Sequence, residues 1–451
     1  MDMSIIETLA SYVPTQLLRL LLANPVPARK PSDASFQAAA LFVRIEGFNT
    51  LFAHLLHDES AGVGASMKKL SQVLNAYFSL LVDFAKAEGG DIVGLSSDKA
   101  LVLWPISNER MTRGTVLALA TATRRAAQCA LSLRETLHSY EAHQNEAPHS
   151  DEAPHSDETL TLSASVAAGN VCTASLGGAL GRWEFLASGE AVVQAYTIGR
   201  DARPGDVLLS PEAYALIRAQ CVGQELSSGY FSLVNIRFPL PAKPLEPVDL
   251  KPEIAAPLRA YIPGAVLNSV TMWQTEWFGD LRDVTMLCIN VPDVGYRNPL
   301  ERIHDTMRTL QRALYRSAGS VIKLFVGAEG MVLVAALGLP PLAYADTAIR
   351  GVQAALFVSQ ELQKMALSCR VGVSTGKAFC CSIGNPRRRE YTVVGDVGAT
   401  ALQLMRVAPS ILCDSVTYEA VLDQVDFEVM PPINLADSDE PLLVYCPLRV
   451  R

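Results

Sequence analysis

The sequence lacks the features that mark membrane, secreted and nucleic-acid-binding proteins. No uninterrupted apolar run reaches the roughly 18 residues that a membrane-spanning helix needs. The N-terminal stretch Met1-Asp-Met-Ser-Ile-Ile-Glu7 is acidic, whereas a signal peptide begins with basic residues. A formal net charge of −8 and a pI near 5.5 argue against a nucleic-acid-binding protein. We therefore expect a soluble cytoplasmic protein, with a cilium or flagellum as a second candidate location.

Cysteine motifs are also absent. The nine cysteines form no Cys-x-x-Cys pair and show no cysteine and histidine spacing typical of a metal site. Free thiols in a reducing compartment are expected, and the adjacent Cys380 and Cys381 are interpreted as part of a buried strand. Residues 139–158 repeat an acidic unit that contains histidine. Its histidines are weak candidate metal ligands, but the composition favours a disordered surface insertion.

One sequence pattern is used twice along the chain. The matching segments pair 168–177 with 375–384, 182–189 with 388–395, and 207–214 with 411–418. This repeat predicts two tandem copies of one α/β domain, over 36–238 and 265–451. The proline-rich stretch 239–264 is expected to be a semi-rigid linker between them. Residues 1–35 predict a lead-in of two short helices, separated at Pro14, that cover the domain that follows.

The first copy begins with a strand, a helix and a hairpin. Residues 40–49 predict a buried strand that turns at Gly47 into a helix, and 67–87 predict a long amphipathic helix. Residues 89–104 predict a β-hairpin with Ser96, Ser97 and Asp98 at its tip. Further helices are expected over 113–137 and 190–200.

This layout resembles that of the class III nucleotidyl cyclases, and especially the first cyclase domain of the bicarbonate-responsive soluble adenylyl cyclases. The resemblance implies an α/β (α+β) fold of two tandem ferredoxin-like domains. In that family the two domains pack head to tail as a pseudo-symmetric pair, here an intramolecular pseudo-dimer. Such a pair forms one catalytic site and one degenerate site at the domain interface.

The catalytic site implied by this resemblance has a damaged metal centre. In the family, one aspartate of the first strand and one at the hairpin tip hold two divalent ions against the nucleotide phosphates. Asp98 stands at the hairpin position, but Arg44 stands at the strand position. Glu46 is an alternative ligand if the strand extends that far. The permanent charge of Arg44 is expected to repel a metal and to attract Asp98.

Two consequences of Arg44 stay open. An Arg44–Asp98 salt bridge would close an empty pocket. Alternatively, Arg44 would pair directly with nucleotide phosphates and permit ATP to bind without a metal.

The second domain is expected to supply base recognition and charge stabilisation. Lys323 matches the adenine-contacting lysine of the family, and Thr392 matches its base-contacting partner. Ala399 and Gln403 replace the asparagine that positions the ribose and the arginine that neutralises the phosphate. The loss of one such charge-stabilising donor typically costs about 10²–10³ in rate. A solvated lysine and an ordinary strand threonine remain the alternative interpretation of Lys323 and Thr392.

The second, pseudo-symmetric site has fewer functional residues still. By the internal repeat, Asn290 and Gly327 occupy its metal positions. Its recognition positions are occupied by Gly94, Leu186, Val193 and Thr197. In the soluble cyclases a lysine and an arginine bind bicarbonate in this region, and Gly94 and Tyr196 replace them here. Bicarbonate sensing is therefore not expected.

The sequence favours a catalytically inactive cyclase homologue that binds a protein partner, or a larger assembly, as a structural or regulatory module with residual ATP binding. One alternative is an active adenylyl cyclase, which would make cAMP and pyrophosphate and need magnesium or manganese at an unusual metal site. The other alternative is a ligand-free structural component of a large assembly, for example in a cilium. Neither alternative is resolved by the residues alone.

Overall fold

The structure of this chain, a computed structural model, describes residues 3–47, 63–106, 113–145, 160–271, 279–342, 344–434 and 441–451. Two short helices come first, α1 (Met3–Ala10) and α2 (Thr15–Ala23). The first domain then contains β1 (Ser32–Glu46), α4 (Val63–Ala87), β2 (Asp91–Leu95), β3 (Lys99–Pro105), α5 (Arg113–Asn145), β4 (Thr161–Gly177), η1 (Ala179–Gly181), β5 (Trp183–Ser188), α6 (Glu190–Asp201), β6 (Val207–Leu209), α7 (Pro211–Ile217), β7 (Cys221–Glu225) and β8 (Phe231–Ile236).

The second domain repeats this order of elements after a connecting segment. The connection contains η2 (Pro252–Ile254), α8 (Ala255–Arg259) and α9 (Gly264–Thr271). The domain itself contains β9 (Asp280–Val291), α10 (Leu300–Arg316), β10 (Ser320–Gly327), β11 (Gly330–Leu337), α11 (Thr347–Lys364), β12 (Arg370–Asn385), β13 (Arg388–Val394), α12 (Asp396–Val407), β14 (Ile411–Asp414), α13 (Ser415–Val421), β15 (Val425–Ile433) and β16 (Leu442–Val450).

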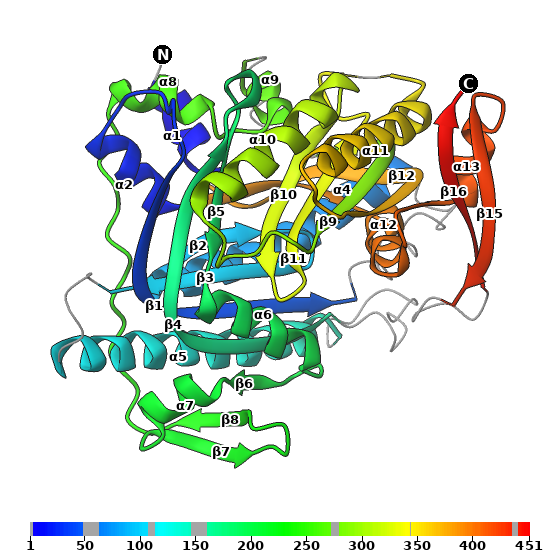
Figure 1. The fold of residues 1–451 in the computed structure, drawn as a ribbon. Helices are drawn as coiled ribbons and strands as arrows, with labels where there is room; N and C mark the ends of the chain where they lie inside the picture. The colour runs from blue at the N-terminus through cyan, green and yellow to red at the C-terminus, as the bar shows by residue number, and fades with distance from the viewer. Residues whose placement is uncertain are drawn as a thin grey trace.

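The two sheets have the same topology, which confirms the internal repeat and the predicted fold. Each is an eight-stranded sheet, with the order β2-β3-β1-β4-β6-β8-β7 in the first domain and β10-β11-β9-β12-β14-β16-β15 in the second. An additional strand pairs at the same place in each sheet, β5 with β4 and β13 with β12. The terminal hairpins β7–β8 and β15–β16 lie far apart in the molecule, at the bottom and right of Figure 1.

Strand β1 is buried on both faces, which explains why its sequence is a nearly continuous apolar run. Alternate side chains of a strand point to opposite faces. Ala39, Leu41 and Val43 therefore pack in a core with α4 and α5, whereas Ala40 and Phe42 pack against α6. The helices that sandwich this strand fix the direction in which its last residues leave the sheet.

The domains exchange arms across their interface. The β4–β5 arm of the first domain places Leu176 and Leu186 in the core of the second domain, beside α10. Reciprocally, the β12–β13 arm places Phe379 and Ile383 in the core of the first domain, beside α4. This reciprocal packing is the head-to-tail pseudo-dimer that the sequence predicted.

The sequence analysis predicted that the lead-in helices cover the first domain, but in the structure they also pack against the second domain. Ile6 and Leu17 belong to a core cluster with Leu258 of α8 and with Met286 and Ala401 of the second domain. Figure 1 places α1, α2, α8 and α9 together at one corner of the molecule. The expectation was wrong because the apolar face of the lead-in meets the apolar connection and second sheet, a contact that its own periodicity cannot reveal.

Three boundaries also differ from the expected ones. Helix α5 continues to Asn145, so residues 139–145 of the segment expected to be disordered are helical, and 146–158 lie outside the described residues. No proline or glycine interrupts 139–145, and the first proline is Pro148. Strand β1 begins at Ser32, inside the expected lead-in, and the expected linker 239–264 ends in η2 and α8.

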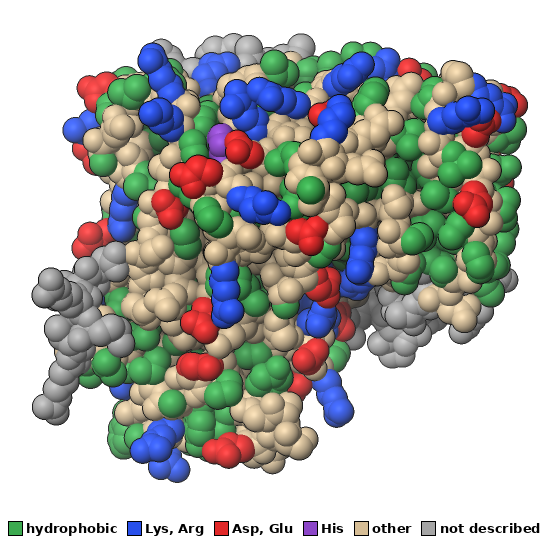
Figure 2. Space-filling model, in the orientation of Figure 1, with side chains coloured by type: hydrophobic (Ala, Val, Ile, Leu, Met, Phe, Trp, Pro, Cys, Tyr) green, Lys and Arg blue, Asp and Glu red, His purple; other side chains and the backbone are tan. Residues whose placement is uncertain are grey.

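The surface and the thiols agree with the compositional analysis. All nine cysteines are unpaired, and Cys380 and Cys381 are buried within β12. None of the described helices combines the length and the apolar character needed to cross a membrane. Acidic and basic side chains are interspersed over the face drawn in Figure 2.

Candidate functional site

Arg44 and Asp98 lie at neighbouring ends of β1 and the β2–β3 hairpin, but they do not pair with each other. The Arg44 guanidinium contacts the Glu46 carboxylate and donates a hydrogen bond to the Ala202 carbonyl at 3.1 Å. The Asp98 carboxylate instead pairs with the Lys99 ammonium at 2.8 Å. The prediction of an Arg44–Asp98 salt bridge is therefore wrong. Each of these side chains has an opposite charge within two residues of it in the sequence, Glu46 for Arg44 and Lys99 for Asp98.

The residues present do not fit two divalent ions. Strand β1 extends to Glu46, so this carboxylate does share a face with Arg44, as the sequence suggested. Hard cations need several oxygen ligands, whereas each carboxylate here, Glu46 and Asp98, is neutralised by a cationic side chain. Over the described part of the chain, no three side chains of Asp, Glu, His or Cys converge as metal ligands would.

Helix α12 follows β13 as the sequence predicted, and its substituted positions offer no positive charge. Ala399 is half-buried and carries no polar group, and Gln403 is half-buried as well. The Gln403 amide oxygen is buried without a hydrogen-bond partner among the described residues. Thr392 is buried in β13 and pairs with Cys381 of β12, so it is a core strand residue in this conformation.

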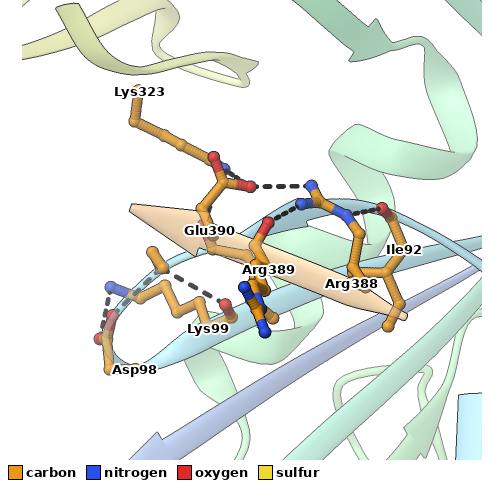
Figure 3. A network of polar contacts seen from close by, with 9 residues as sticks. Ile92, Asp98, Lys99, Lys323, Arg388, Arg389 and Glu390 are labelled. Carbon is orange, nitrogen blue, oxygen red and sulfur yellow. Dashed lines mark hydrogen bonds and ion pairs between the residues drawn. The ribbon is translucent and has the colours of Figure 1, made fainter. Parts of the chain in front are cut away.

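Lys323 forms part of a clamp that joins the two domains. Its ammonium donates a hydrogen bond to the Leu95 carbonyl of β2 at 2.8 Å and lies 3.6 Å from the Glu390 carboxylate. Arg388 reaches the same carboxylate at 2.8 Å and donates to the Ile92 carbonyl at 3.0 Å. Figure 3 shows Lys323 and Arg388 converging on Glu390 from two sides.

The clamp exists because β2 is an edge strand. Its outer carbonyls have no neighbouring strand, and a buried carbonyl without a donor is costly. Lys323 and Arg388 of the second domain supply these donors, and the Arg388 side chain is only 3% exposed. The sequence analysis missed this role for Arg388 and Glu390, although both lie in one of the repeated segments. The Ile92 carbonyl that Arg388 contacts is 296 residues earlier in the chain, and no local pattern encodes that contact.

A cavity of about 80 Å³ lies beside the clamp, between the domains. Lys323, Gly94 and Tyr196 line it, so the structure joins one residue predicted for the first site with two predicted for the second. Glu184, which the sequence analysis did not single out, also lines it. This volume holds a few water molecules rather than a nucleotide.

The charged groups around this cavity are perturbed by burial. Burial raises the pKa of Glu184 to about 7, although the nearby Arg182 guanidinium opposes the rise. Burial lowers the pKa of Lys323, and the Glu390 carboxylate opposes that change. Burial also raises the pKa of the Tyr196 hydroxyl, and the negative charge of Asp98 adds to this effect.

The pseudo-symmetric second site contains mainly structural side chains. Asn290 of β9 is 4% exposed and donates hydrogen bonds to the Glu329 and Met331 carbonyls. Thr197 donates its hydroxyl hydrogen to the Val193 carbonyl of its own helix. The predicted positions Leu186 and Gly327 are a core residue of β5 and the last residue of β10.

Comparisons with known proteins bear on the fold. No protein-family model matches the chain. Adenylate cyclase type 10 from Oryctolagus cuniculus is 24% identical over 450 residues, which cover 92% of this chain and 26% of that protein. Adenylate cyclase type 10 from Mus musculus is 22% identical over 482 residues, which cover 98% of this chain and 28% of that protein. The chain thus spans about a quarter of the length of these relatives.

Among solved structures, the class III adenylyl cyclase-like ATP-binding protein from Pseudomonas aeruginosa is similar over nearly the whole chain. The TM-score is 0.52 at 13% sequence identity, and the match covers 86% of this chain and 85% of that one. At this identity the match establishes the shared fold. The chain is therefore similar in sequence to adenylate cyclases of type 10, and it carries two tandem domains of the class III cyclase fold.

Proposed function

We propose that this chain is a catalytically inactive relative of the adenylyl cyclases and acts as a partner-binding or regulatory module. The observation that carries the proposal is the internal pairing at the first site. Arg44 is engaged with Glu46, and Asp98 is engaged with Lys99. The residues at the two metal-ligand positions of a cyclase, Arg44 and Asp98, are thus each neutralised by a neighbouring side chain.

The chemistry of cyclisation explains why this pairing matters. The ribose 3′-hydroxyl must attack the α-phosphate in line while pyrophosphate leaves, and two metal ions stabilise the attacking and leaving oxygens. Arg44 removes one of the two carboxylates that such a metal pair requires. Gln403 has no charge with which to stabilise the developing negative charge, a loss that typically costs about 10²–10³ in rate.

The relatives indicate which ligand to test. The proteins of 22–24% identity are named adenylate cyclases, and the similar solved structure is named an ATP-binding protein. ATP is therefore the appropriate probe for residual binding at the first site. For Lys323 to contact ATP, its ammonium must first break its hydrogen bond to the Leu95 carbonyl and its ion pair with Glu390.

A thermal-shift experiment on the full chain tests the proposal. We expect that adding magnesium or manganese to an ATP-containing sample gives no additional stabilisation, because the first site has no intact metal site through which a metal ion would strengthen ATP binding. The Asp98→Ala variant should show the same ligand profile as the wild-type chain. Ligand that binds the folded state alone must raise the melting temperature, so a working site would be detected.

The contrary outcome is equally clear. A stabilisation by ATP that requires the metal and disappears in Asp98→Ala would identify a functional metal centre, and the proposal would then be rejected.

A further inference from the structure

A second cavity, distinct from the clamp, is lined largely by arginine. Its volume is about 400 Å³, and its lining residues are Arg200, Asn290, Glu329, Arg370, Met405 and Arg406. Arg200 comes from the end of α6 in the first domain, and the others come from the second domain. The cavity therefore lies where the two domains meet, on the side of the pseudo-symmetric second site.

The charges around this cavity do not balance. Three arginines and one glutamate line it, which leaves an excess of two positive charges. Arg200 uses that carboxylate, because it pairs with Glu329 at 2.6 Å. Within the described ranges, Arg370 and Arg406 have no acidic partner. Like charges that share a hollow repel one another, so an anion bound between them would be stabilised.

The two unpaired arginines are held on rigid elements. Arg370 begins β12, directly opposite Asn290 in the β9–β12 ladder, and Arg406 lies in the last turn of α12. Asn290 fixes the neighbouring hairpin through its hydrogen bonds to the Glu329 and Met331 carbonyls, at 2.8 and 3.3 Å. The backbone positions of these groups are thus set before any ligand arrives, which lowers the entropic cost of binding.

In the internal repeat, the arginine of the facing strand pair lies on different strands in the two domains. Ser163 stands opposite Arg44 in the first domain, at the place that Arg370 holds opposite Asn290 in the second. Each of these two facing pairs contains one arginine, Arg44 on β1 in the first domain and Arg370 on β12 in the second. The last turn of α6 and that of α12 also contain one arginine each, Arg200 and Arg406. Sequence reasoning identified Asn290 but not Arg370, because only the strand register brings Arg370 to the cavity.

We propose that this cavity binds a polyphosphate group directly through its guanidinium groups, without a divalent metal. Arginine suits this ligand because its planar fork donates two parallel hydrogen bonds to phosphate oxygens. Two free guanidinium groups on different elements match a chain of phosphates better than they match a single phosphate. A metal is not needed, since Asn290 is neutral and Glu329 is already paired with Arg200.

Calorimetric titration of the full chain with inorganic triphosphate, in EDTA, tests this inference. We expect saturable binding that weakens as sodium chloride is added. Arg370→Gln and Arg406→Gln should each weaken it by about tenfold or more, the usual effect of losing a charge-assisted hydrogen bond. Arg312→Gln is the matched control, because Arg312 is exposed on α10 and does not line the cavity.

Parallel titration with ATP separates the two sources of this ligand. Equal affinity for ATP and triphosphate would mean that only the phosphates are recognised, whereas tighter binding of ATP would assign a contribution to the nucleoside. Either result supports the inference if Arg370→Gln weakens the binding of both ligands. No binding of triphosphate by the wild-type chain, or equal weakening by Arg312→Gln, would overturn it. Because these titrations contain no metal, their outcome is independent of the metal-dependent test at the first site.

Discussion

At the scale of single residues, each charged side chain predicted for the first site lies against an opposite charge of its own domain. Arg44 lies against Glu46, Asp98 against Lys99, and Lys323 against Glu390. The sequence analysis expected Arg44 and Asp98 to attract each other, whereas in the structure each contacts a different side chain. The partner of a charged side chain depends on rotamers and on backbone direction at the strand end, which residue spacing does not contain.

Glu184 provides a prediction at this scale. In the folded protein the pKa of the Glu184 carboxyl is about 7, whereas the ordinary pKa of a glutamate is 4.5. Between these values the folded state binds more protons than the unfolded chain, so the free energy of unfolding falls as the pH rises through this window. Glu184→Gln removes the ionisable group, and we expect it to raise the free energy of unfolding at pH 8 by up to about 3 kcal/mol.

Urea unfolding between pH 5 and pH 8.5 measures this effect. The gain of Glu184→Gln over the wild-type chain should grow with pH across that range. The exposed Glu419→Gln on α13 is the control and should show no such dependence. A gain that is constant with pH, or no gain, would contradict the assigned pKa.

At the scale of elements, helix α2 depends on a side chain from another strand. Pro14 is at its N-terminus and provides no side-chain cap, and the Asp91 carboxylate of β2 accepts hydrogen bonds from the Thr15 and Gln16 amides. The distances are 2.9 and 2.8 Å, and Asp91 is 2% exposed. This contact attaches the lead-in to the first domain, while its apolar face packs on the second.

Asp91→Ala tests this attachment. The variant leaves the buried Thr15 amide and the part-buried Gln16 amide without an acceptor, so we expect the free energy of unfolding to fall by about 2–4 kcal/mol. Asp91→Asn keeps one acceptor oxygen and should lose less. Denaturant unfolding of both variants gives the comparison, with the exposed Asp249→Ala as control. A loss within the error of that control would mean that Asp91 does not hold α2.

Elements were the most predictable scale. The hydrophobic pattern located β1, α4 and the β2–β3 hairpin, because the burial of a strand or a helix is visible in the order of apolar and polar residues close together in the sequence. The same reasoning failed at α5, where polar composition suggested disorder although nothing breaks the helix before Asn145. It also failed for α1 and α2, whose apolar faces were visible but whose partners were not.

At the scale of the whole molecule, the repeat determines the architecture. Two identical strand orders and exchanged β4–β5 and β12–β13 arms follow from one pattern used twice. Lys323 and Arg388 then use their charges to join β2 to the second domain. This role of Lys323 and Arg388 in holding the domains together was not predictable, because the edge carbonyls that they satisfy meet them only in the assembled pair of domains.

The most direct test of this account is the rate of cAMP formation by the purified full chain with ATP and manganese, measured beside Asp98→Ala. The account predicts no product from the wild-type chain above the level of the variant, because Arg44 stands in place of one carboxylate ligand and Gln403 in place of the charge-stabilising arginine. Metal-dependent cAMP formation by the wild-type chain that Asp98→Ala abolishes would contradict it and establish an active cyclase.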